Sequence, residues 1–170
     1  MTAGGTTPLA AKIATSTIPI VMTGSVDPVG AGLVASLARP GGNVTGLSGL
    51  QPELTTKRLE VLKDAVPKLT RVGLLRSPGA ISVPGDPQSK ELRPAAVALK
   101  LKLEEIGTQP DAKGLESAFQ IAKQKQVGAI MTMQSNPLFA ERKRIVELAG
   151  KYRLPAIYPR KEFVDEGGLM

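Results

Sequence analysis

Residues 24–35, GSVDPVGAGLVA, contain a glycine pattern of the kind that positions a nucleotide cofactor. Gly30 and Gly32 match Gly-x-Gly-x-x-Ala, in which the glycines let a pyrophosphate approach the start of a helix. However, Asp27 and the proline after it predict that a helix begins before both glycines. Asp27 would also place a carboxylate where the pyrophosphate should lie. We therefore expect the glycines to pack a helix closely against a sheet, with a dinucleotide-binding enzyme as the alternative.

The residue types that most enzymes use are missing or badly spaced. The chain contains neither cysteine nor histidine, which excludes thiolate catalysis, disulfides, Cys/His zinc sites and imidazole acid–base catalysis. Glu104 and Glu105 are adjacent on a predicted strand, so they point to opposite faces and cannot work as a pair. Residues 46–50, GLSGL, differ from a nucleophile elbow in the last position, and no phosphate-binding Gly-Lys-Ser/Thr occurs. We therefore expect that the chain is not an enzyme and that it has neither a cofactor nor a metal site.

The composition is that of a globular protein with a sizeable core. Of 170 residues, 42% are hydrophobic and 22% are charged. The net charge is +7, but lysine and arginine are dispersed over the polar faces of predicted helices, and aromatic residues are too few for base stacking. We therefore expect no nucleic-acid partner. No apolar run approaches the ~20 residues of a membrane span, and the first residues show no signal peptide.

Short β-branched runs alternate with stretches in which apolar residues recur every three or four positions. The predicted strands cover residues 18–23, 44–47, 71–75, 101–106, 127–132 and 156–158. This alternation predicts an α/β fold with a Rossmann-like parallel sheet flanked by helices. Asp27, Asp111 and Asn136 have the types and positions of helix N-caps. Residues 77–89, rich in proline, glycine and serine, predict either a surface insertion or a ligand-binding loop at the carboxyl edge of the sheet.

Four stretches of the sequence resemble one known protein family. They are ATSTIPIVMTGSVDPVGAGLVASLARPGGNVTGLS at residues 14–48, KRLEVLKDAVPKLTRVGLL at residues 57–75, NPLF at residues 136–139 and RKRIVELAGKYRLPAIYPRKEFVDEGGLM at residues 142–170. These stretches are similar to the ABC transporter substrate-binding proteins often described as tryptophan/tyrosine-type. The resemblance covers almost the whole chain, and its long continuous strings are far more specific than an isolated glycine pattern.

The resemblance implies a type I periplasmic-binding-protein fold, in which two Rossmann-like lobes close on a small ligand. Residues 1–50 would form the end of an incomplete first lobe, and residues 51–170 most of the second lobe. Because family members are much longer, residues 1–50 would expose strand edges that could pair in a homodimer. The chain would then be an internal fragment of a longer relative.

The family also carries functional expectations. It implies an amino acid or a related small molecule as ligand, an ABC permease as partner of the full-length relative, and a periplasmic or extracellular membrane-associated location for that relative. A module of the same fold that senses an effector or serves as a scaffold, without a transport role, is the alternative.

Three candidate ligand-binding residues lie in the first part of the chain, where we place them by their position in this two-lobe scheme. Thr6 and Thr7 open a predicted helix, and their hydroxyls together with the helix N-terminus suit a carboxylate. Asp27 suits a ligand ammonium group. Helix capping is the alternative role of all three.

Five further candidates follow predicted strands in the second part of the chain. Ser77, Ser135 and Asn136 offer hydroxyl and amide groups for hydrogen bonds with a ligand. Tyr158 and Arg160 offer a ring and a guanidinium that could stack on the ligand or pair with it. Their alternative roles are a cap for Asn136, core packing for Tyr158 and a solvated charge for Arg160.

Overall fold

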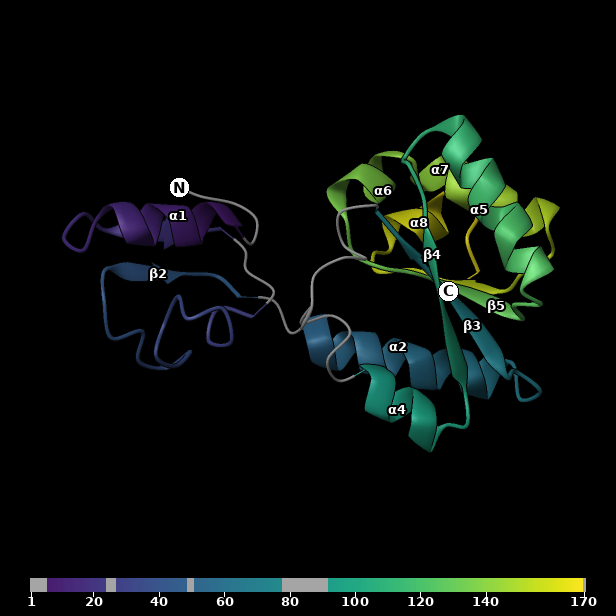
Figure 1. Ribbon diagram of the computed structural model, residues 1–170, viewed down its shortest axis with the longest axis horizontal. Coiled ribbons are helices and arrows are strands. Elements are labelled where there is room, and N and C mark those ends of the chain that lie inside the picture. Colours follow the sequence, from purple (N-terminus) through teal and green to yellow (C-terminus); the bar gives the residue numbers. More distant parts are fainter. Residues whose placement is uncertain (1–5, 24–26, 49–50, 78–91, 170) are drawn as a thin grey trace. The chain divides into compact units, whose positions relative to one another are not determined.

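The computed structural model describes residues 6–23, 27–48, 51–77 and 92–169 (Figure 1). The chain divides into two compact units, Met1–Leu54 and Thr55–Met170, and each is described by itself. Within the described residues, no helix is both long enough and apolar enough to cross a membrane. The predicted assignment of residues 1–50 and 51–170 to two lobes stays a prediction.

The described part of the first unit contains a two-stranded parallel sheet and one helix. Its elements are α1 (Thr6–Ala14), β1 (Ile20–Met22) and β2 (Val44–Gly46). Ile20 pairs with Val44 and Met22 with Gly46, so the two strands run in the same direction. The buried apolar residues of this unit are Ile20, Met22, Leu33, Val34 and Val44, with Ala11 of α1 packed against them. Both strands lie inside the ranges predicted for them.

The segment that follows Asp27 forms turns, so the predicted helix over this region is wrong. Gly30 N donates to Asp27 Oδ1 at 2.8 Å, and a Cβ at Gly30 would overlap that carboxylate. Gly32 has φ of +66°, a left-handed conformation that interrupts a helix. Lys12 Nζ donates to Gly32 O at 2.6 Å, which joins α1 to the turn. The glycines therefore serve a tight turn, not close packing of a helix on a sheet.

The second unit is a four-stranded parallel sheet covered by helices on both faces. The strands β3 (Arg71–Arg76), β4 (Lys102–Gly107), β5 (Ala129–Thr132) and β6 (Ala156–Ile157) lie in the order β4-β3-β5-β6. The helices are α2 (Gln51–Ala65), α4 (Leu92–Ala98), α5 (Ala112–Gln124), α6 (Asn136–Ala140), α7 (Arg142–Lys151) and α8 (Glu162–Asp165). The predicted α/β class and all four of these strands are confirmed.

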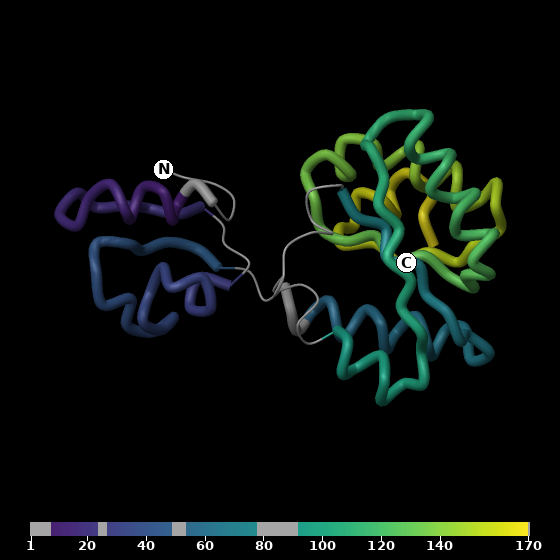
Figure 2. Tube along the Cα trace, viewed as in Figure 1, coloured from purple at the N-terminus to yellow at the C-terminus, as the bar shows by residue number. Residues whose placement is uncertain are grey.

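The two faces of this sheet have separate apolar clusters. α2 and α4 cover one face, where Leu59 and Leu62 of α2 pack with Leu92 of α4. α5 and α7 cover the other face and lie side by side in both views, with Phe119 and Leu148 in the shared cluster (Figures 1 and 2). Successive side chains of a strand point to opposite faces of the sheet, so alternate residues of β3 belong to the two clusters. The resulting three layers are those of a doubly covered parallel sheet.

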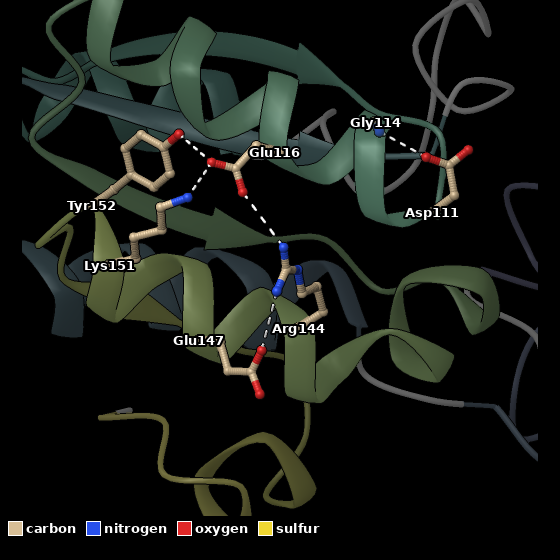
Figure 3. Close-up of polar contacts among 7 residues, drawn as sticks. All are labelled: Asp111, Gly114, Glu116, Arg144, Glu147, Lys151 and Tyr152. Atoms are coloured by element: carbon tan, nitrogen blue, oxygen red, sulfur yellow. Dashed lines mark hydrogen bonds and ion pairs between the residues drawn. The ribbon is translucent and has the colours of Figure 1, made fainter.

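The helix starts of this unit show where capping predictions succeed and fail. Gly114 N donates to Asp111 Oδ1 at 2.7 Å, so Asp111 is the N-cap of α5, as predicted (Figure 3). The predicted cap at Asn136 is wrong by one position. Ser135 is the N-cap of α6, with extended backbone and a side chain that accepts from Leu138 N, and Asn136 is already helical. Two adjacent residues of capping type before a proline leave this choice open in the sequence.

Candidate functional site

The carboxyl edge of the four-stranded sheet brings two predicted site residues into contact. β3 and β5 are parallel neighbours, so the residues that follow them emerge side by side. Ser77 follows β3, Ser135 lies just beyond β5, and their Oγ atoms are 2.6 Å apart. Ligands of open parallel sheets bind at this edge. The two hydroxyls therefore form a small polar centre in the expected place.

The short helix α6 connects Ser135 to a second predicted residue. Ser135 Oγ accepts from Leu138 N at 3.4 Å, and Asn136 is exposed in the first turn. The guanidinium of Arg160 lies over the ring of Phe139 at 4.4 Å from its centroid. This cation–π contact holds Arg160 beside α6, not in bulk solvent. The sequence analysis does not single out Phe139 as a partner of Arg160. The available signal is its place about one turn after the start of α6.

Tyr158 has a packing role in this structure. Its exposed fraction is 6%, and its ring stacks on Phe163 with centroids 4.8 Å apart. Burial raises the pKa of the Tyr158 hydroxyl to about 12. The ring belongs to the apolar cluster beneath α5 and α7. Its predicted ligand contact stays a prediction, and we give it no part in the candidate site.

Arg58 of α2 is a candidate site residue that the sequence interpretation missed. Its Nη2 donates to Thr55 Oγ1 at 3.0 Å, and its Nη1 donates to Thr132 O at 3.4 Å. Thr132 is the last residue of β5, so these contacts place the guanidinium at the carboxyl edge. Burial lowers the pKa of Arg58 to about 10. The available signal was an arginine beside Leu59 on the helix face that turns toward the core.

The β4 side of the same edge contains a buried ion pair. Arg76, the last residue of β3, is 2% exposed, and its Nε lies 2.8 Å from Glu105 Oε2. Arg93 of α4 also pairs with Glu105 at 3.4 Å. Glu104 pairs instead with Lys102 and Lys125, and hydrogen bonds from these two lysines hold the pKa of its carboxyl below the usual value. The two glutamates thus act on opposite faces, as predicted.

The remaining predicted site residues belong to the first unit. Thr6 and Thr7 open α1, and their side chains lie outside the described residues. Asp27 is partly buried, and its carboxylate accepts from the Gly30 amide. The predicted loop over residues 77–89 also lies outside the described residues, apart from Ser77. Across the described ranges, no group of three acidic, cysteine or histidine side chains could hold a metal ion.

A cavity of about 350 Å³ lies elsewhere in the second unit, beside the edge strand β6. Its walls come from α7, from the segment that leads into β6 and from Gly167–Leu169: Val146, Ala149, Gly150, Arg153, Leu154, Pro155, Ala156, Tyr158, Gly167, Gly168 and Leu169. Arg153 is its one ionisable side chain apart from the Tyr158 hydroxyl. Ligand sites combine an apolar wall with several convergent polar groups. The carboxyl edge supplies the convergent polar groups that this cavity lacks.

Comparison with known proteins places this architecture in a family. A solved conserved domain protein from Vibrio cholerae has 29% identity and a TM-score of 0.78, with 98% of this chain and 54% of that chain covered. A solved ABC domain in complex with L-Trp from Streptococcus pneumoniae has 26% identity and a TM-score of 0.76, with 98% and 55% covered. The fold is that of the type I periplasmic-binding proteins, of which this chain spans about half the length.

The family model for ABC transporter substrate binding proteins matches residues 1–170, and the chain belongs to this family. A curated relative, the tyrosine-binding protein of Clostridioides difficile, is 48% identical over 66 residues. That match covers 39% of this chain and 19% of the relative. The family expected from the sequence strings is therefore confirmed.

Proposed function

We propose that this chain is part of the extracytoplasmic solute-binding component of an ABC importer, and that it binds an amino acid or a closely related small molecule. The observation that carries the proposal is the polar centre at the carboxyl edge, where Ser77 and Ser135 meet at 2.6 Å. Arg58 and Arg160 add positive charge along the same edge. Membership of the substrate-binding family supports this use of the edge.

The proposed ligand class comes from two relatives. One relative is described as a tyrosine-binding protein, and another was solved in complex with L-Trp. In our proposal, Asp27 accepts the ligand ammonium group, and Ser77, Ser135, Asn136 and Arg160 contribute from the second unit. A ligand that contacts both units favours their closed arrangement, and an ABC permease recognises that arrangement. A homodimer through the first unit stays a prediction for light scattering to check.

The described turn argues against the dinucleotide-binding alternative. Gly30 and Gly32 lie in turns, and residues 33–48, which follow them, contain no helix whose N-terminus could accept a pyrophosphate. The carboxylate of Asp27 already receives the Gly30 amide, which occupies a donor that a phosphate would need. A sensing or scaffold module without transport remains the alternative within the same fold.

A thermal-shift screen of the chain against the amino acids, nicotinamide dinucleotides and flavins tests the proposal. We expect a saturable rise in melting temperature with one class of amino acid, because a ligand that binds only the folded state stabilises it. The rise should disappear in Asp27→Ala but persist in Asp64→Ala, since Asp64 is an exposed residue of α2. No shift with any amino acid, or a shift with a dinucleotide alone, would contradict the proposal.

A further inference from the structure

Arg58 is a partly buried cation whose described partners are neutral. It donates one hydrogen bond to the Thr55 hydroxyl and one to the Thr132 carbonyl. Guanidinium groups have five N–H donors, so these two bonds leave donors available. Within the described ranges, no carboxylate forms an ion pair with Arg58. The charge therefore lacks the compensation that partly buried charges usually receive.

Neighbouring cations at this end of the unit are compensated differently. Arg76 pairs with Glu105 at 2.8 Å, and Arg142 pairs with Glu166 at 3.1 Å. Arg160 rests on the face of Phe139. Arg58 has neither type of partner among the described residues, and burial lowers its pKa to about 10, so it is still charged at neutral pH.

One hydroxyl at this edge lacks a hydrogen-bond partner although it is buried. It is Thr132 Oγ1, on the residue whose carbonyl accepts from Arg58. Buried polar atoms without partners carry a free-energy cost unless something binds them. The unpartnered Thr132 hydroxyl, on a residue that also contacts the uncompensated guanidinium, is a second sign that this edge accepts a polar ligand group.

We propose that Arg58 binds the carboxylate of the amino-acid ligand at this edge. The proposal rests on the proposed function and specifies which residue recognises the anionic group. A guanidinium forms two parallel hydrogen bonds to a carboxylate, which gives both strength and orientation. It replaces the expectation that Thr6 and Thr7 bind this group, and it leaves the ligand ammonium to Asp27.

Calorimetric titration of the whole chain with L-tryptophan, L-tyrosine and their carboxamides tests this inference. The amides keep the ring and the amino group but lose the negative charge. We expect Arg58→Gln to weaken binding of the acids by about 10- to 100-fold, the range of a lost hydrogen bond to a charged group. Binding of the amides should change little. Arg58→Lys should recover part of the loss, because it keeps the charge without the planar fork.

Arg71 provides a matched control at the opposite end of the same sheet. It is the first residue of β3, and its Nη1 donates to Lys125 O at 3.1 Å. Arg71→Gln should leave the affinities for acids and amides unchanged. If Arg58→Gln binds the acids like the wild type, or weakens acids and amides equally, the inference is overturned while the proposed function stands. If the wild type binds neither acids nor amides, the proposed function fails and the inference fails with it.

Discussion

Glu116 of α5 accepts hydrogen bonds from Lys151 Nζ at 2.5 Å and from the Tyr152 hydroxyl at 2.6 Å (Figure 3). Arg144 of α7 lies 3.6 Å from its other oxygen. The hydrogen bonds from Lys151 and Tyr152 lower the pKa of Glu116 below its usual value of 4.5. The Glu116 carboxylate therefore links α5 to α7, through Arg144 and Lys151 of α7 and through Tyr152 at the end of that helix.

We predict that Glu116→Gln lowers the melting temperature at neutral pH. The melting temperature of the variant should also fall less steeply as the pH is lowered. A lowered carboxyl pKa contributes stability that is fully present above pH 4.5 and is lost as pH falls through the lowered pKa. Thermal unfolding between pH 7 and pH 3 measures this effect. Glu147→Gln is the control, because among the described residues Glu147 pairs only with Arg144, at 3.5 Å on the surface. If both variants change the melting temperature and its pH dependence equally, the contacts of Glu116 do not contribute the predicted stability.

At the scale of single residues, the sequence predicts where a candidate site residue lies in the fold better than it predicts which groups that residue contacts. Ser77 and Ser135 are predictable because polar residues that follow parallel strands emerge at one edge, and the structure joins them by a hydrogen bond. Arg58 is not predictable in this way, since one of its acceptors, the Thr132 carbonyl, lies 74 residues further along the chain. Tyr158 also follows a strand, but its ring turns into the core and stacks on Phe163.

At the scale of elements, we predict opposite effects for two glycine-to-alanine changes. A Cβ at Gly73 of β3 would lie 2.7 Å from Ile106 Cδ1 and 2.9 Å from Ile130 Cδ1, so Gly73→Ala should destabilise the fold by about 1–3 kcal/mol. Gly150 lies in α7 with open space around it, so Gly150→Ala should stabilise by about 0.5–1 kcal/mol. Urea denaturation measures both. A stable Gly73→Ala variant would show that the sheet face is not closely packed there.

Each strand could be predicted as an element, but a helix was predicted after Asp27 where the chain forms turns. Short apolar, β-branched runs between turn residues identify each strand of both sheets within a few positions. The segment that follows Asp27 has apolar spacing and a start signal typical of a helix, but the glycines decide the outcome. The Asp27 carboxylate packs against Gly30, and Gly32 takes a positive φ. Local capping chemistry thus stabilises a turn where the periodicity indicates a helix.

At the scale of the whole molecule, we predict that residues 51–170 fold alone. The two large apolar clusters contain only residues of the second unit, and the small cluster contains only residues of the first. A shortened chain over residues 51–170 should keep its circular dichroism spectrum and the main unfolding midpoint of the full chain. If the shortened chain is unfolded, the two units depend on each other for stability, and the predicted division into lobes fails.

The most direct test of the account is a titration of the isotopically labelled chain with L-tryptophan, followed by amide NMR spectroscopy. If the carboxyl edge of the second unit is the ligand-binding surface, the largest shift changes should occur at Arg58, Ser77, Thr132 and Ser135. Amides around the cavity beside β6, such as Val146, should change little. Changes concentrated at that cavity, or no changes at saturating ligand, would contradict the assignment of the site.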